Sequence, residues 1–328
     1  NPLDFALYIS FFPKLIMGPI SRYGDIIPQI ENRVFSSEKF TEGIYRFVFG
    51  LAKKVIIADQ LGITVDQIFA NPANQNSIAT AWLGDIGYEM QIYFDFSGYT
   101  DMVIGLGKMF GFDLPENFNY PYISMSVSEF WRRWHITLSS WFRDYVFYPL
   151  EFKRRRTKTF RQESNTLIVF FLTGLWHGAA WHYVIWGLWH GLFISIETFL
   201  RNRKIKVKIP ALLQILLTML VVTIGWVIFR SGSVGYAAKY LGVMFGLIKP
   251  LSNGVTLAWY LTPKIATILV IAAVACIPWK QVFPRVMGKL AGTKEELIFR
   301  DVSLVILLAI SIILVMTSSY NAFIYFKF

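Results

Sequence analysis

Three uncharged apolar stretches in the second half of the chain have the composition of membrane-spanning helices. Residues 211–229 carry no charge over 19 positions, and residues 302–316 carry none over 15. Residues 265–277 form a third stretch, which residues 257–261 extend across a Thr-Pro-Lys sequence. A helix needs about 20 mostly apolar residues to cross a bilayer. We therefore predict three spanning helices, and the middle one, over residues 257–277, carries a proline and a lysine.

Residues 166–196 are also apolar, but four glycines and three histidines interrupt them. Their 31 positions are too many for one span and too few for two full spans with a turn. We therefore predict a pair of short or re-entrant helices. Broken backbone at membrane depth is tolerated only where protein covers it or water reaches it, so this segment predicts a cavity.

The remaining apolar segments carry charges. We expect residues 3–20, 43–57 and 78–96 to form helices packed inside a bundle or at its edge. Residues 128–148 alternate aromatic and charged side chains, which predicts an amphipathic helix at the membrane interface, and residues 236–248 predict a second. Together these patterns predict an all-α, multi-pass transmembrane bundle.

Composition agrees with this class. Apolar residues make up 55% of the chain and charged residues 16%, against about 25% charged in a typical soluble domain. The high hydrophobicity also excludes a disordered chain, and the single cysteine, Cys276, excludes an internal disulfide framework. Because the sequence has no internal repeat and no low-complexity linker, we predict one domain over residues 1–328. The chain starts with Asn-Pro and has no signal-peptide pattern, so we expect an N-terminally cut sequence that lacks preceding helices.

The net charge of +11 is concentrated in three basic clusters. Residues 153–161, 201–208 and 280–300 hold sixteen of the 32 Lys and Arg residues. Basic loops between spans mark the cytoplasmic side, so we predict that all three clusters are cytoplasmic loops and that the C-terminus lies outside. Such clusters orient the protein and contact anionic lipid. This placement argues against nucleic acid as a partner.

All four histidines and seven of the eleven tryptophans fall between residues 131 and 190. The tripeptide Trp-His-Gly occurs twice, around His177 and around His190. An imidazole in a membrane segment usually faces a cavity or a partner, and a neutral imidazole is a competent general base. We predict a functional role for His177 at the expected helix break, whereas His190 fits a functional or a structural role equally well. We expect His182 to be structural, His135 to be interfacial, and the flanking indoles to wall a narrow passage.

Other polar groups favour structural roles. No two histidines are four residues apart, and no carboxylate lies between the three that share residues 166–196, which disfavours a metal site. Three carboxylates, Glu89, Asp95 and Asp101, lie in the aromatic segment around residue 95. Carboxylates in such surroundings need partners. We predict an ion-pair network, with lining of a polar route as the alternative. The cations available in sequence are Arg132, Arg133 and Lys108.

Several motifs of the chain resemble the membrane-bound O-acyltransferase (MBOAT) family. They are EFWRRWHITLS at 129–139, WFRDY at 141–145, GLWHGA at 174–179 and WGLWHG at 186–191, with further matches at 11–20, 93–99, 225–230 and 319–321. The resemblance covers essentially the whole chain and is strongest to the bacterial alginate O-acetyltransferase branch. The absence of a histidine after residue 190 separates the chain from the related D-alanyl transfer proteins.

The resemblance implies a membrane enzyme with a central tunnel. The family's essential histidine maps to His177 and a second one to His190. Six further residues are expected to line or support the tunnel: Trp176, Trp181, Trp189, Asp95, His135 and Arg133. The implied reaction moves an acyl group, most simply acetyl from acetyl-CoA, out of the cytoplasm to a polysaccharide hydroxyl, without a bound cofactor. The implied setting is the lipid of the bacterial cytoplasmic membrane, with an SGNH-hydrolase-like partner outside. The resemblance also implies that roughly the first quarter of a family member precedes this sequence.

Two alternatives share the same sequence features. A transporter or channel also has broken helices and buried polar groups. A non-catalytic membrane scaffold for a secreted acetyltransferase would need the helices but not the histidines.

Overall fold

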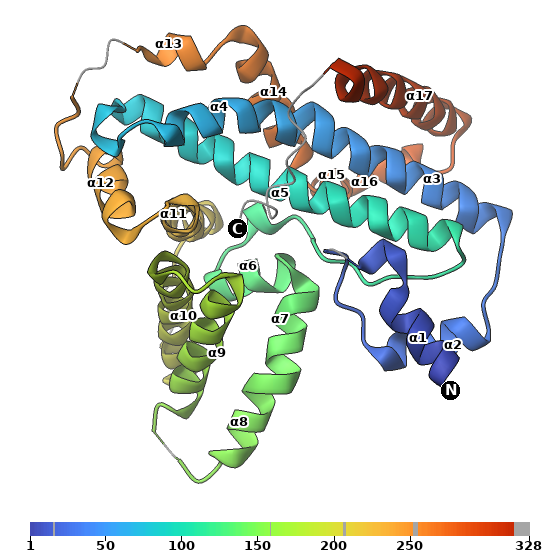
Figure 1. The fold of residues 1–328 in the computed structure, drawn as a ribbon, viewed down its shortest axis with the longest axis horizontal. Helices are drawn as coiled ribbons and strands as arrows, with labels where there is room; N and C mark the ends of the chain where they lie inside the picture. The colour runs from blue at the N-terminus through green and yellow to red at the C-terminus, as the bar shows by residue number, and fades with distance from the viewer. Residues whose placement is uncertain (16, 158, 206–207, 252–254, 318–328) are drawn as a thin grey trace. The chain divides into compact units, whose positions relative to one another are not determined.

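The computed structural model describes residues 1–15, 17–157, 159–205, 208–251 and 255–317, and every regular element in these ranges is a helix. This confirms the all-α class. The helices, labelled in Figure 1, divide into two compact units.

The first unit is assembled from three separate parts of the chain: Asn1–Gln60, Met90–Asn119 and the described residues from Ile268 onward. Its elements are α1 (Pro2–Ser10), the 3₁₀ turn η1 (Phe12–Lys14), α2 (Tyr23–Glu31), α3 (Ser37–Ala52), the π-helical η2 (Lys53–Ala58), α15 (Trp279–Val282), α16 (Pro284–Leu290) and α17 (Lys294–Thr317), with parts of α5 (Ile78–Met109) and α14 (Pro263–Ala275).

Glycines set the distance between α3 and α5. A Cβ atom at Gly50 would lie 2.6 Å from the carbonyl oxygen of Gly98, and one at Gly43 would lie 2.6 Å from that of Gly105. On each helix the two glycines are seven residues apart, which returns them to nearly the same face after two turns. Small residues of this kind let helix backbones pack closely without steric conflict.

Buried ion pairs join the same helices. Lys54 places its Nζ 2.5 Å from Asp59 and 2.7 Å from Asp95. Asp101 pairs with Arg46 at 2.7 Å and with Lys53 at 2.6 Å. Asp95 and Asp101 therefore take part in ion pairs, as predicted for these two carboxylates.

The cations expected to neutralise these carboxylates have other partners. Lys108 pairs with Glu42 at 2.5 Å, and Arg133 pairs with Glu129 at 2.8 Å, one turn earlier on its own helix. The partners of Asp95 and Asp101 lie more than 40 residues earlier in the chain. Proximity in sequence was therefore a poor guide, because the pairing follows the packing of α3 and η2 on α5.

The second unit comprises Leu61–Glu89 and Tyr120–Thr267. Its elements are most of α4 (Asp59–Ala70), the 3₁₀ turns η3 (Ala73–Gln75) and η4 (Pro121–Ile123), α6 (Val127–Arg133), α7 (Ile136–Phe142), the π-helical η5 (Arg143–Phe147), α8 (Tyr148–Lys153), α9 (Arg161–His177), α10 (Trp181–Asn202), α11 (Ala211–Arg230), α12 (Val234–Met244) and α13 (Leu257–Tyr260), with the first part of α5.

Among the described residues, three helices are long and apolar enough to cross a membrane: α10, α11 and α17. The spans predicted over residues 211–229 and 302–316 are confirmed by α11 and α17. The span predicted over residues 257–277 is wrong as one helix, because the chain breaks between α13 and α14. Pro263 is the first residue of α14, the position where the missing N–H of proline costs nothing.

The interruption predicted within residues 166–196 is confirmed, since α9 ends at His177 and α10 begins at Trp181. The second helix of this pair is not short, however: α10 has 22 residues and is itself a candidate span. The glycines of α10 do not break it, because they are contact positions against α9.

The single amphipathic helix predicted over residues 128–148 is also wrong. α6 ends at Arg133, and α7 begins at Ile136 after a corner at Trp134 and His135. His135 has a φ of +43°, a left-handed conformation that no α-helix can include. The aromatic and charged alternation is therefore shared by two short helices and the π-helical η5.

The basic clusters lie in different structural contexts. The first connects α8 to α9 and the second connects α10 to α11, as predicted. The third lies on α15, α16 and the beginning of α17 rather than in a loop. The helix predicted over residues 236–248 is present as α12. The last residues, 318–328, on which the position of the C-terminus depends, lie outside the described residues.

Lys54→Met tests the buried ion pairs, because it leaves Asp59 and Asp95 together without their cation. We expect the free energy of unfolding to fall by about 3 to 5 kcal/mol, as is usual when one partner of a buried pair is removed. The measurement is the unfolding midpoint of the detergent-solubilised protein. Lys39→Met is the control, since its partner Asp113 has a side chain that is 65% exposed, and its loss should be about 1 kcal/mol or less. Equal losses would contradict the assignment.

Candidate functional site

The pairing of α9 with α10 is the framework of the site, and the two helices lie side by side in Figure 1. A Cβ atom at Gly174 would lie 2.5 Å from the carbonyl oxygen of Tyr183, and a Cβ atom at Gly187 would collide with the carbonyl oxygen of Phe170. The two backbones can therefore touch only because these positions lack side chains. The contact holds the end of α9 against the first turns of α10.

The break between the helices places His177 at the last position of α9. The chain then passes through Gly178 and two alanines before α10 begins. The ring of Tyr183 packs over Gly178, where a Cβ atom would lie 2.7 Å from ring carbon Cε2. Glycine is thus required at this position by a close approach, and the approach closes the turn.

His177 is half-buried among aromatic rings from three elements. Its ring centroid lies 5.0 Å from that of Trp186 on α10 and 5.1 Å from that of Phe229 on α11, both edge to face. Trp176, the preceding residue, contacts it at 4.8 Å. The imidazole is therefore held in place on several sides, and part of its surface remains open.

His190 lies deeper in the same cluster and is completely buried. Its ring centroid lies 5.3 Å from that of Trp131 and 5.4 Å from that of Trp186, and Phe130 stacks on it at 6.3 Å. Neither ring nitrogen has a hydrogen-bond partner among the described residues. Trp186 contacts both His177 and His190, so one indole links the two histidines.

Glu197 of α10 fixes the helix that carries Trp131. Its carboxylate accepts hydrogen bonds from the backbone N–H groups of Val127 at 2.7 Å and Ser128 at 2.9 Å, the first two residues of α6. A carboxylate at a helix N-terminus satisfies free N–H groups and interacts favourably with the helix dipole. This capping ties α6 to α10 and brings Trp131 against His190.

His135 is buried rather than interfacial, which corrects the prediction for this residue. It is 5% exposed, and its ring contacts that of Trp176 at 6.2 Å. Burial lowers the pKa of His135 to about 3, and the neighbouring charge of His177 acts in the same direction. At neutral pH the His135 side chain is therefore uncharged. The left-handed corner turns it inward, which its charged sequence neighbours did not indicate.

The tryptophans expected to line a tunnel lie in different places. Trp176 and Trp181 are 54% and 74% exposed, and Trp189 is half-buried with its indole N–H donating to the carbonyl oxygen of Val221. Of these three, Trp176 contacts His177 and His135. The cluster also holds Trp131, Trp186 and Trp226, whose indole N–H groups are buried without a partner among the described residues. The tunnel role of the first three stays a prediction.

The supporting roles expected for Arg133 and Asp95 stay predictions. Arg133 pairs with Glu129 on the same helix, and Asp95 belongs to the first unit, where it pairs with Lys54. Among the described residues, no group of three or more His, Cys, Asp or Glu side chains is placed to hold a metal ion.

A buried carboxyl pair on α5 was not recognised as a pair from the sequence. Asp85 is fully buried, and both its carboxylate oxygens lack a partner among the described residues. Glu89, one turn later, accepts a hydrogen bond from the Thr223 hydroxyl on α11. Three residues along α11, Trp226 contacts Tyr88 edge to face. The spacing of four residues in an apolar segment was the available signal.

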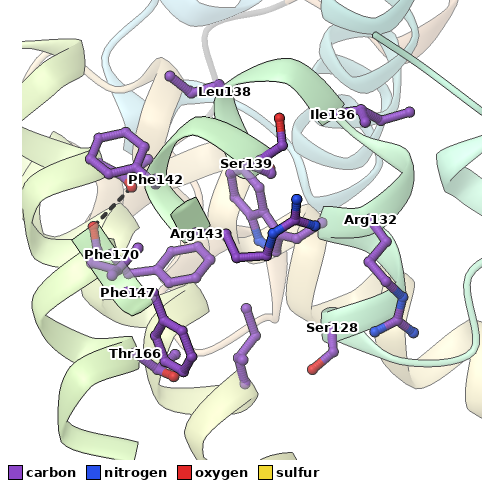
Figure 2. A pocket seen from close by; sticks show the side chains of 15 residues that line it. Ser128, Arg132, Ile136, Leu138, Ser139, Phe142, Arg143, Phe147, Thr166 and Phe170 are labelled. Atoms are coloured by element: carbon purple, nitrogen blue, oxygen red, sulfur yellow. Dashed lines mark hydrogen bonds between the residues drawn. The ribbon is translucent and has the colours of Figure 1, made fainter. Parts of the chain in front are cut away.

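Beside the cluster lies a largely apolar pocket of about 440 Å³. Figure 2 shows its wall, which comes from α6, α7, η5, α9 and α10, with Arg132 and Arg143 among its few charged groups. Trp131 lines this pocket, contacts Phe170 at 5.1 Å and contacts His190 as well. One indole therefore separates the pocket from His190.

Known proteins of one family match the part of the chain that contains the whole site. The family model for MBOAT, the membrane-bound O-acyltransferase family, matches residues 1–238, which include every residue of the histidine cluster. The chain is 46% identical over 247 residues to the probable alginate O-acetylase AlgI of Pseudomonas putida, covering 75% of this chain and 50% of that protein. It is 40% identical over 260 residues to the peptidoglycan O-acetyltransferase of Helicobacter pylori (78% and 48%). It is 36% identical over 247 residues to the teichoic acid D-alanyltransferase of Bacillus subtilis (70% and 62%).

The chain spans about half the length of the curated alginate O-acetylases that it matches.

Gly225→Ala tests the packing around His190. The added Cβ atom would lie 2.6 Å from Nε2 of His190, so the ring must move against its aromatic neighbours. We expect a loss of about 1 to 3 kcal/mol in the free energy of unfolding, as for overpacked cores. Gly235→Ala on α12 is the matched control, because a Cβ atom there meets nothing within 4 Å. An unfolding midpoint for Gly225→Ala as high as that of the control would contradict the packing.

Proposed function

Because this chain belongs to the membrane-bound O-acyltransferase family, we propose that the protein containing it transfers an acyl group, most simply acetyl, from a thioester to a polysaccharide hydroxyl. The names of two relatives, an alginate O-acetylase and a peptidoglycan O-acetyltransferase, support a polysaccharide acceptor. The proposed setting is the bacterial cytoplasmic membrane. The basic clusters face the cytoplasm, from which acetyl-CoA enters as donor substrate.

The position of His177 is the observation that carries this proposal. It lies at a helix end in contact with the aromatic cluster, and the next three residues are half-buried or exposed. A general base must be both held in orientation and reachable by substrate. Among the four histidines, His177 is half-buried and is contacted by Trp186 and Phe229, whereas His135, His182 and His190 are buried.

The reaction can be followed through the imidazole of His177. The acceptor hydroxyl gives its proton to the imidazole as its oxygen attacks the thioester carbonyl carbon. A C–O bond forms, the C–S bond breaks, and the thiolate leaves with the proton that the imidazole returns. The buried indole N–H groups are the kind of donor that stabilises negative charge on the tetrahedral intermediate in a site that excludes water.

In the proposed mechanism His190 acts on His177 indirectly, through Trp186. It contacts Trp186, which in turn contacts His177. Its complete burial makes direct access for a polysaccharide hydroxyl sterically difficult. We therefore assign His190 to the positioning of Trp186 and to the polar lining of the cluster.

The apolar pocket is the proposed place for the donor's thioester arm. Four residues of α9 line it, at positions 166, 169, 170 and 173, and His177 follows at the next helical spacing on the same face. An arm lying along this face would bring its thioester toward the end of α9. Transfer to the polysaccharide is direct or passes through an SGNH-hydrolase-like partner outside the membrane.

His177→Ala in the full-length protein tests the proposal. We expect acetyl transfer from acetyl-CoA to surface polysaccharide to fall about a hundredfold or more, the usual range for loss of a general base. His182→Ala is the matched control: it removes a buried histidine from the second position of α10 and should retain most activity. If His177→Ala is folded and fully active, the assignment of His177 as the general base fails.

A further inference from the structure

A polar pocket of about 590 Å³ lies where the first two basic clusters meet. Arg155 and Arg161 from the first cluster and Arg203 from the second line it together. The ring of Phe160 stacks on that of Phe199 at 5.9 Å and joins the α8–α9 connection to the end of α10. Two clusters that are 40 residues apart in sequence thus form one concave surface.

Two of the three guanidinium groups have no carboxylate partner among the described residues. Arg155 lies over the ring of Phe152 at 4.9 Å, and Arg203 lies over the ring of Phe199 at 5.3 Å. Arg161 differs, because its Nε donates to Glu151 at 2.9 Å. Stacking on an aromatic ring orients a guanidinium while its N–H donors stay available.

Neutral donors complete the lining. Thr157, Thr159, Gln162 and Asn202 also line the pocket and bring hydroxyl and amide groups to it. Arg161 is the first residue of α9, a helix of 17 residues, so the free N–H groups of its first turn lie at this pocket. Glu163, which also lines the pocket, is the one carboxylate in this set, and it accepts a hydrogen bond from Asn202 at 3.3 Å.

We propose that this pocket binds a phosphate group. Three arginines, hydroxyls, amides and a helix N-terminus are the donor set that recognises phosphate oxygens, and the guanidinium fork matches them in pairs. An anionic phospholipid headgroup and the phosphates of a soluble donor present the same chemistry.

The direction of α9 favours the phosphates of a soluble acyl donor over a lipid headgroup. This preference rests on the proposed function. Arg161 begins the helix at the phosphate pocket, and His177 ends it, roughly 24 Å away at 1.5 Å per residue. The apolar pocket lies along the residues between. A donor with phosphates at one end and a thioester at the other would match this order.

The test is a binding measurement on the purified full-length protein, so it does not depend on acyl transfer. One arm measures adenosine 3′,5′-bisphosphate by calorimetry, and the other measures phosphatidylglycerol against phosphatidylcholine by native mass spectrometry. The variant is Arg155→Gln with Arg203→Gln. The matched control is Arg156→Gln with Lys208→Gln, which removes the same charge from the same two clusters at exposed positions outside the pocket.

We expect one probe to bind wild type and to lose about tenfold or more in affinity in the pocket variant, because each lost guanidinium removes charge-assisted hydrogen bonds to the phosphate. The control should stay within about twofold of wild type. A second variant, Arg155→Lys with Arg203→Lys, distinguishes lost binding from misfolding. It keeps the two positive charges but lacks the paired N–H donors of the guanidinium groups, so it should bind with intermediate affinity. Binding of neither probe, or equal weakening by the control, overturns the proposal, whereas acetyl transfer that fails while binding persists overturns only the proposed function.

Discussion

Close contact between α9 and α10 at Gly174 and Gly187 is the constraint on which the histidine cluster depends. It lets the end of one helix and the middle of the other share Trp186, so that His177 and His190 are held by the same indole. Wider spacing would admit side chains between the helices and separate the two imidazoles. The glycines in this segment therefore serve packing within the pair as much as the break between its members.

The ion pairs of the first unit and the histidine cluster of the second bury polar groups in different ways. In the first unit, lysine and arginine side chains neutralise carboxylates, as in the pairing of Lys54 with Asp59 and Asp95. In the second, the cluster around His190 is built from imidazole and indole groups, which carry polarity without a fixed charge. A charged group held in this cluster would need a counter-ion that the surrounding rings do not supply. Neutral, polarisable groups suit a site where charge develops only during a reaction.

Much of the fold was predictable because it follows from local composition. Uncharged length indicated α11 and α17, and the glycines around His177 indicated the helix break. The corner at His135 was not predictable, since nothing in its neighbours signals a left-handed residue. The partners of Asp95 and Asp101 depended on which helices pack together. Trp186 could have been found, because it lies four residues before His190 on one helix face, whereas Trp131 joins the cluster only through tertiary contact.

The four glycines between α3 and α5 have a consequence for how this protein can change over generations. Gly50 faces Gly98 and Gly43 faces Gly105, so a methyl group at any one of them meets the backbone of the other helix. A substitution on one side cannot be relieved by making its partner smaller, because the partner is already the smallest residue. Variation at these positions is therefore open only to lineages in which the two helices move apart, and the ion pairs along the same contact would have to lengthen with them.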